Sequence, residues 1–583
     1  MKRILYSATL FALCVFCSCK NSNDRNNMDD NFNLFKQRFI DKLWELNPAW
    51  ATGMGYHKFD DVLEIPTQAN MANRVKALNA LNDSLKTFPV DSLSPENKID
   101  WKLMDNYCRA TSFYFNEFKA WQWNPAQYNV GETFELVMNR HDVKVDRKLE
   151  LVQKKLADVK KYFDAARANI SNPTPEHTQL AIDQNLGSLS VFSSISDSVN
   201  KSMLNEDRKT TIHHLLDGAK AEVTAYADWL RDSIQPALKK SVGKDFRIGK
   251  ELYDKMFGFE IMSHYSPEEI FEKAKIHKKE LHQKMAELAH ELWPKYLANE
   301  KMPADTLVMI KKVIDKISEQ HCKPEDFQKT IEAQLSQLSK FIKEKDLITL
   351  DPNKPLKVRP TPEYMAGTAG ASINAPGPYD RDAETFYNVG SLSGETKEKA
   401  ESWLREYNDY ILQILNIHEA IPGHYTQLVY SNQSPSLVKS IFQNNTMIEG
   451  WAVYGERMML EEGYGNNAPE MWLMYYKWNL RSTLNTILDY SIQVLNMQKE
   501  DALQLMLHEG FQQEAEANGK WKRATLSQTQ LMCYFTGFTE IYDLREEMKK
   551  KLGKSFSLKQ FHEKFLSFGS SPVKFIREIM LAN

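Results

Sequence analysis

Apolar residues recur every three or four positions along most of the chain, the spacing that buries one face of an α-helix. One helix start is marked clearly, because Ser266, Pro267 and Glu269 combine an N-cap, a proline at the first helical position and a capping box. That pattern runs to Leu292, with Pro294 just beyond it. Further stretches with helical spacing are 146–168, 209–233, 305–318, 325–345, 396–420, 446–461, 468–497 and 527–550. We therefore expect a mainly α-helical fold.

One segment breaks the helical pattern. Residues 359–390, RPTPEYMAGTAGASINAPGPYDRDAETFYNVG, are dense in Gly and Pro, and their short apolar pieces suit only brief strands or loops. A small extended element beside a candidate active site could offer backbone groups to a peptide by strand addition. An ordinary surface connection fits the sequence equally well, so both interpretations stay open.

The N-terminus has the pattern of an export signal. A basic start precedes an apolar run from Ile4 to Phe16 that is too short to span a membrane. The segment resembles a bacterial lipoprotein signal, with Cys19 as the lipidated residue, and a plain secretory signal is the alternative. Residues 20–33 are rich in Asn and Asp and lack apolar periodicity, as in a flexible tether. We expect an exported lipoprotein, periplasmic or anchored at the outer membrane.

These boundaries predict residues 1–19 as the signal peptide, 20–33 as the tether and 34–583 as a single helical catalytic domain, with two lobes as an alternative. The 74 basic and 77 acidic side chains leave a net charge of −3, so no nucleic-acid partner is indicated. Outside the signal, the cysteines are Cys108, Cys322 and Cys533, and no two have metal-site spacing. We expect no disulfide framework and no thiolate metal site.

The stretch NIHEAIPGHYTQ, residues 416–427, holds the candidate chemistry. His418 extends an apolar helix face and taken alone would be a core histidine, but Glu419 follows it and His424 lies six positions on. In the HExxH arrangement the two histidines are four apart and share one helix face, whereas a separation of six turns them about 240° apart on an ideal helix. Pro422 and Gly423 must distort the helix between the histidines. A bulge of two residues would return His424 to the metal side.

A third ligand is available in NNTMIEGWAVYGERMM, where Glu449 lies 25 residues after His424. Gluzincin-type sites take a glutamate from a second helix at about this distance. Thr446 and Glu449 also fit a capping box, in which the glutamate would only satisfy a backbone donor, and the spacing leaves both interpretations open. Glu456, two turns later, is then a candidate to orient a histidine N–H.

At these residues the sequence resembles the bacterial family catalogued as domain of unknown function 885. The motifs that match are HEAIPGHYTQ (418–427), EGWAVYGE (449–456), IGKELYDKMF (248–257), PEYMAGTAGA (362–371) and Tyr534-x-x-Gly537 with Leu544-Arg545. The resemblance covers nearly the whole mature chain. One departure is QTQLMCYFTG, where relatives often carry Pro-Gly-Gln-Ala before the tyrosine, which leaves the role of Tyr534 less defined.

The resemblance implies a helical fold similar to the thimet oligopeptidase and neurolysin group and to the thermostable carboxypeptidases, with a deep cleft. Members of the family look like zinc metallopeptidases with a lengthened HExxH. It implies that His418, His424 and Glu449 bind the metal, which two imidazoles and a carboxylate suit best as zinc, although cobalt, manganese or iron could bind the same set. Glu419 would be the general base.

The first hypothesis is thus a zinc hydrolase of short peptides, in which an open metal position activates water for Glu419 to deprotonate. Tyr534 is a candidate oxyanion donor, or else a core aromatic residue. Arg523 and Arg545 could hold a terminal carboxylate, or serve as structural ion-pair residues. The remaining candidates near the site are Gln427, Gly370 and Ala371. Two alternatives are a zinc amide hydrolase with a non-peptide substrate and a non-catalytic binding lipoprotein. The oligomeric state stays open.

Overall fold

The computed structural model describes residues 27–240, 243–361, 371–380, 384–390, 392 and 395–582. The expected signal peptide with Cys19 lies outside these residues, and so does Gly370. Mainly α structure with a small sheet is confirmed. Within the described part of the chain, no helix has the length and apolarity needed to cross a membrane.

The chain divides into two compact units. The first contains Met1–Gly243 and Ser436–Phe442, and the second contains Lys244–Pro435 and Gln443–Asn583. Every candidate site residue that the structure describes belongs to the second unit.

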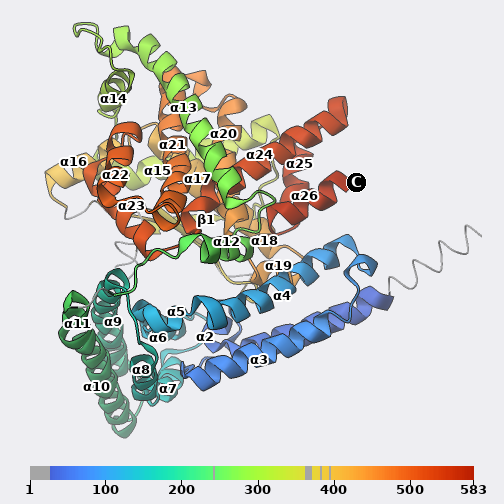
Figure 1. Cartoon of the computed structure of the whole chain (residues 1–583), viewed down its shortest axis with the longest axis vertical. Coiled ribbons are helices and arrows are strands. Elements are labelled where there is room, and N and C mark those ends of the chain that lie inside the picture. The colour runs from blue at the N-terminus through green and yellow to red at the C-terminus, as the bar shows by residue number, and fades with distance from the viewer. Residues whose placement is uncertain are drawn as a thin grey trace, which may run out of the picture. The chain divides into compact units, whose positions relative to one another are not determined.

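The first unit is built of helices throughout its described residues. Its long helices α3 and α4 pack side by side, as do α9 and α10 (Figure 1). After a helix at residues 27–46, the helices are α2 (Pro48–Gly53), α3 (Gln68–Leu85), α4 (Pro95–Phe113), α5 (Ala120–Trp123), α6 (Gly131–Met138), α7 (Val145–Leu156), α8 (Val159–Asn169), α9 (Pro175–Lys201), α10 (Glu206–Trp229), α11 (Gln235–Lys240) and α19 (Leu437–Ile441).

The expected tether is wrong from residue 27 onward, where a helix begins. Phe32, Phe35 and Phe39 follow one another at helical spacing and are all buried. Asp29 accepts hydrogen bonds from the backbone N–H of Ser94 and from the side chain of Asn97. The Asn- and Asp-rich composition concealed an amphipathic helix that packs on α4.

The second unit surrounds one nearly fully buried helix, α21, against which the long helix α13 packs (Figure 1). Its helices are α12 (Gly249–Glu260), α13 (Pro267–Tyr296), α14 (Thr306–Ile317), α15 (Phe327–Lys345), α16 (Lys397–Glu406), α17 (Ile411–Glu419), α18 (His424–Asn432), α20 (Asn445–Glu461), α21 (Pro469–Gln493), α22 (Lys499–Gln504), α23 (Glu514–Leu526), α24 (Cys533–Leu552), α25 (Leu558–Leu566) and α26 (Val573–Ala582).

Helix ends follow local side-chain chemistry. The capping box at Ser266 and Glu269 is present, and α13 continues one turn further than expected, with Pro294 inside it. The stretch expected as one helix at 396–420 is two helices, because the buried Asn408 side chain accepts the backbone N–H groups of Tyr410 and Ile411. The stretch at 146–168 is also two helices, α7 and α8.

The expected extended element is a three-stranded sheet in the order β1-β3-β2. Strand β1 (Leu356–Pro360) pairs parallel with β3 (Thr385–Val389), and β2 (Ala371–Asn374) pairs antiparallel with β3. The central strand is tied to the helix that carries His418, since the buried Tyr387 hydroxyl donates to Asn416 Oδ1 at 2.9 Å. The sheet is therefore fixed directly against α17.

Helices α20 and α24 cross in backbone contact. A Cβ atom built on Gly537 would lie 1.9 Å from the Thr446 carbonyl oxygen, and one built on Gly450 would lie 2.3 Å from the Gly537 carbonyl carbon. No side chain fits at either position. This crossing places the first turn of α24, which carries Tyr534, against the part of α20 that carries Glu449.

We predict that Gly537→Ala lowers the free energy of unfolding by at least about 2 kcal/mol, because a methyl group forces two packed helices apart. Thermal and denaturant unfolding measure the change. Gly258→Ala is the matched control, because this exposed glycine of α12 has no heavy atom within 4 Å of its built Cβ. Equal stability of the two variants would contradict the close crossing.

Candidate metal centre

A break in the helix, rather than a bulge within it, brings the two histidines together. Helix α17 ends at Glu419 and α18 begins at His424. The backbone N–H of Gly423 donates to the Ile417 carbonyl at 2.9 Å, which folds the turn back onto α17. The Ile421–Pro422 peptide bond within this turn is cis.

Gly423 is required because the chain packs closely against α17 at this position. A Cβ atom at this position would lie 1.8 Å from the carbonyl oxygen of His418 and 2.3 Å from that of Ile417. Helix α20 holds the other side of the turn, where the Trp451 indole N–H donates to the Pro422 carbonyl at 2.7 Å. The turn is thus packed between α17 and α20.

The two imidazoles converge on one carboxylate oxygen. Glu449 Oε2 lies 3.6 Å from His418 Nε2 and 3.5 Å from His424 Nε2, and the two rings stand at 84° with centroids 4.7 Å apart. Ligand atoms of a tetrahedral zinc site are about 3.3 Å apart, given zinc–nitrogen and zinc–oxygen bonds of roughly 2.0–2.1 Å. Glu419 is close as well, since it offers a ligand atom within 4.8 Å of both histidines. The donor atoms of His418, His424 and Glu449 therefore fit a metal ion without large rearrangement.

The capping-box interpretation of Glu449 is wrong. Helix α20 is capped two residues earlier, where the Asn444 side chain accepts the backbone N–H of Met447 at 2.9 Å. Thr446 lies inside the helix. Glu449 is therefore released from any capping role and faces the histidines.

Glu456 holds His418 from behind. Its Oε1 lies 2.7 Å from His418 Nδ1 and also accepts the Trp478 indole N–H at 3.0 Å. The carboxylate is fully buried. This contact holds a proton on Nδ1 and directs Nε2 toward Glu449, where Nε2 would bind a metal ion once its own proton is lost.

The electrostatics of the cluster favour positive charge. Burial works to lower the pKa of His418, but hydrogen bonds to Glu449 and Glu456 outweigh it and raise the pKa to about 10. Burial works to raise the pKa of Glu449, but the two histidines hold it well below its usual range. With Glu419, three carboxylates surround two imidazoles, a balance that suits a bound cation.

Glu419 differs from the other two carboxylates in its environment. It is the last residue of α17, and burial raises its pKa, opposed by the charges of His424 and His418. A carboxylate with a raised pKa is a stronger proton acceptor than an ordinary glutamate.

Tyr534 lies in the first turn of α24. Its hydroxyl accepts a hydrogen bond from Arg523 at 3.1 Å, and burial together with the charge of Glu449 raises its pKa to about 12. The phenol therefore stays protonated and can donate a hydrogen bond. It is half-buried, unlike a core aromatic residue.

The other candidates have different positions. Arg545 is a structural ion-pair residue, 2.8 Å from Glu461 and only 7% exposed. Gln427 is fully buried and donates to Ser570, which leaves no contact for a substrate. Ala371 begins β2.

Trp478 is a site residue that the sequence did not reveal. It comes from α21, in a stretch whose aromatic residues recur at helical spacing and so predict only core packing. No short motif connects it with Glu456.

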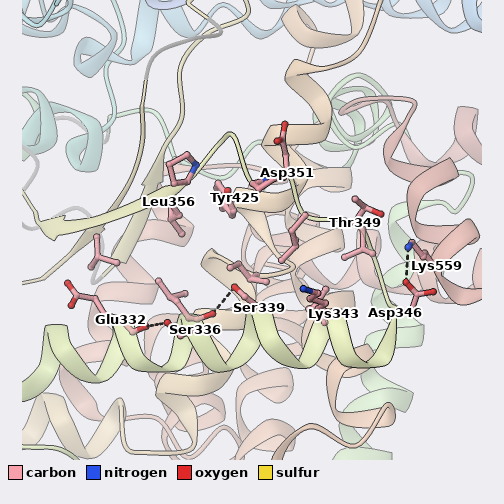
Figure 2. A pocket seen from close by; sticks show the side chains of 18 residues that line it. Glu332, Ser336, Ser339, Lys343, Asp346, Thr349, Asp351, Leu356, Tyr425 and Lys559 are labelled. Carbon is pink, nitrogen blue, oxygen red and sulfur yellow. Dashed lines mark hydrogen bonds and ion pairs between the residues drawn. The ribbon is translucent and has the colours of Figure 1, made fainter.

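A separate cavity of about 850 Å³ is lined by residues of α15, β1 and the start of α18 (Figure 2). Ile421 and Tyr425 contribute to its wall, but none of the candidate metal ligands does. Some of its polar groups bond to one another, as in the Lys559–Asp346 ion pair at 2.7 Å and the Ser336 hydroxyl, which donates to the Glu332 carbonyl. This cavity is distinct from the metal centre.

Comparison with known proteins places the chain. Residues 48–580 match the family described as bacterial protein of unknown function (DUF885). The chain belongs to this family. A solved structure of a candidate lipoprotein of unknown function from Shewanella oneidensis is 49% identical, covers 94% of this chain and 99% of its own, and superposes with a TM-score of 0.87.

A second solved structure, of a candidate lipoprotein from Colwellia psychrerythraea, shares the fold at 17% identity. It covers 96% of this chain and 99% of its own, with a TM-score of 0.77. A search of curated proteins finds no match. The DUF885 resemblance expected from the HEAIPGH and EGWA motifs is thus confirmed.

We predict that Gly423→Ala removes metal binding, because the added methyl group displaces the turn that positions His424. Metal content after loading and dialysis measures the effect. Gly455→Ala is the matched control on the opposite side of the same turn, where a built Cβ lies 3.6 Å from Pro422 Cγ, an ordinary contact. Full metal content in Gly423→Ala would contradict this account.

We also predict that Glu456→Gln weakens metal affinity by about 10- to 100-fold, since the carboxylate orients His418 and makes it more basic. Competition with a fluorescent chelator measures the affinity. Glu461→Gln, on the same helix but bonded to Arg545, should retain the original affinity. Equal affinities of the two variants would show that Glu456 has no influence on the metal.

Proposed function

We propose that this protein is an exported zinc-dependent hydrolase of peptide bonds in short peptides. The observation that carries the proposal is the convergence of His418 and His424 on one oxygen of Glu449, at 3.6 and 3.5 Å, with Glu419 beside them. Buried imidazoles held by a buried carboxylate are a frequent arrangement in metal sites.

His418, His424 and Glu449 are the residues that would hold the ion. When bound, zinc would act as a Lewis acid toward a carbonyl and lower the pKa of water. Two imidazoles and a carboxylate match the donor types that zinc prefers, and the hard oxygen cage of calcium would need more carboxylates.

Glu419 is the proposed general base. Its raised pKa lets it accept a proton from the attacking water and pass that proton to the departing amine. A pure binding site has no need of this group. Tyr534 is the proposed hydrogen-bond donor to the carbonyl oxygen as negative charge develops, because its pKa of about 12 keeps the phenol protonated.

The sheet supports a peptide substrate. Strand β2 packs against α17 and, among the described residues, pairs only with β3 on one side. An extended peptide added along its other side would gain backbone hydrogen bonds next to Glu419. A small acylated amino acid would make few of these bonds, which favours peptides over other amides.

The proposed location is the cell envelope. The signal pattern ending at Cys19 and the two related lipoproteins support an exported, lipid-anchored protein. A hydrolase anchored there would trim peptides for uptake.

We predict that the zinc-loaded protein contains roughly one zinc per chain, that His424→Ala contains little, and that Glu419→Gln keeps its zinc. Peptide hydrolysis should fall by about 10²- to 10⁴-fold in Glu419→Gln, because the base is lost without the metal. Elemental analysis and a panel of peptides and acylated amino acids measure both effects.

The outcomes separate the alternatives. Hydrolysis of acylated amino acids but not of peptides would identify a different amide hydrolase. Zinc without hydrolysis of any substrate would indicate a binding lipoprotein, and zinc retained in His424→Ala would contradict the ligand set.

A further inference from the structure

Three basic side chains gather where α21 meets α23, and one of them, Arg523, contacts Tyr534. Arg481 comes from α21, while Lys520 and Arg523 are three residues apart on one face of α23. We call these three residues the basic cluster. Burial, Arg481 and Arg523, in that order, lower the pKa of Lys520 well below its ordinary value, so the three charges act on one another.

The basic cluster has too few counter-charges. Arg481 forms an ion pair with Glu516 at 2.8 Å. Arg523 donates only to neutral groups, Gln530 at 2.6 Å and Tyr534 at 3.1 Å. Within the described part of the chain, no carboxylate lies within ion-pair distance of Lys520 or Arg523. One paired acid against three bases leaves two basic side chains, Lys520 and Arg523, without a counter-charge.

Two further acids act on the basic cluster only from a distance. Glu406 influences Arg481 but forms its own ion pair with Lys477 at 2.8 Å. Asp489 influences Arg523, but it is buried, and burial raises its pKa to about 7, which weakens its negative charge at neutral pH. Glu406 cannot move to Lys520 without abandoning Lys477.

Lys520 is the most informative member of the basic cluster. It is only 6% exposed, yet none of the described residues forms a hydrogen bond or an ion pair with its amine. Lysine is seldom buried at this level unless it is paired. The Lys520 amine is not among the fully enclosed unpartnered atoms, so it keeps contact with solvent and is accessible to an anion. Arg523, three residues on, is exposed. A buried cation with an exposed cation beside it is the charge pattern of an anion site open on one side.

The basic cluster lies one side chain away from the metal centre. Arg523 donates to the Tyr534 hydroxyl, and Tyr534 is close enough to Glu449 for that charge to raise its pKa. The crossing of α20 and α24 at Gly450 and Gly537 fixes this relation. An anion bound by the cluster would therefore lie beside a substrate at the metal.

We propose that Arg481, Lys520 and Arg523 form a carboxylate-binding subsite that recognises a carboxylate on the peptide substrate. The carboxylate comes either from the C-terminus of the peptide or from an acidic side chain. This inference rests on the proposed peptide hydrolase. Its selectivity follows from the buried lysine, which gains a partner only when a carboxylate is bound.

The test compares three related peptides. The first has a free C-terminal acid, the second is its C-terminal amide, and the third is that amide with one Asp added to the sequence. Their affinities are measured by calorimetry for the zinc-loaded Glu419→Gln protein, and the same protein carrying Lys520→Met provides the comparison. Lys522→Met is the matched control, because Lys522 is exposed on the same helix. Circular dichroism verifies that each variant is folded.

We expect at least one of the two carboxylate-bearing peptides to bind roughly tenfold more tightly than the plain amide. The ratio of these two affinities should fall toward one in Lys520→Met but not in Lys522→Met. Preference for the C-terminal acid or for the added Asp identifies the source of the carboxylate. Equal binding of all three peptides, an unchanged ratio in Lys520→Met, or no binding at all would overturn the subsite.

The same peptides and zinc-loaded protein with Glu419 intact test the underlying function separately. Carboxylate-selective binding without cleavage of any peptide would contradict the hydrolase while retaining the subsite. Cleavage of acid and amide with equal KM would retain the hydrolase and contradict the subsite.

Discussion

The candidate centre depends on the contact between the Gly423 backbone and the carbonyl oxygen of His418. Any side chain at residue 423 would overlap that oxygen, so the turn can approach α17 this closely only because residue 423 has no Cβ atom. The contact lets α17 stop at Glu419 and α18 start at His424 with their histidines facing each other. The lengthened spacing is therefore compatible with the same convergence of imidazoles that a shorter motif achieves on one continuous helix.

Helix α20 connects this turn to the rest of the second unit. Trp451 binds the turn, Glu449 and Glu456 contact the histidines, and Gly450 admits α24. Residues pointing in several directions from one helix thus serve the same centre. The residues of α20 that contact the turn, the histidines or α24 all lie within about two helical turns, in the motif EGWAVYGE at 449–456.

The sequence predicted most of the helices and the residues that converge, since apolar spacing and the His-Glu pattern are local signals. Other features depend on contacts that spacing cannot report. Asn408 splits an expected helix by competing for backbone N–H groups, and Asn444 moves the cap of α20 away from Thr446. Trp478 and Lys520 come from helices whose pattern indicates only burial, so their roles emerge from packing. The expected tether ended too late, because the polar composition of residues 20–33 hid the start of a helix in which Phe32 is buried.

The two carboxylates that contact His418 lie seven residues apart on α20, so both point to the same side of one rigid helix. The imidazole is consequently contacted at both nitrogens by a single helix, which restricts its rotation. Its side chain has already lost its conformational entropy in the folded protein, before any ligand arrives. Binding an ion then requires no further ordering of His418, because the loss of its conformational entropy is already part of the free energy of folding.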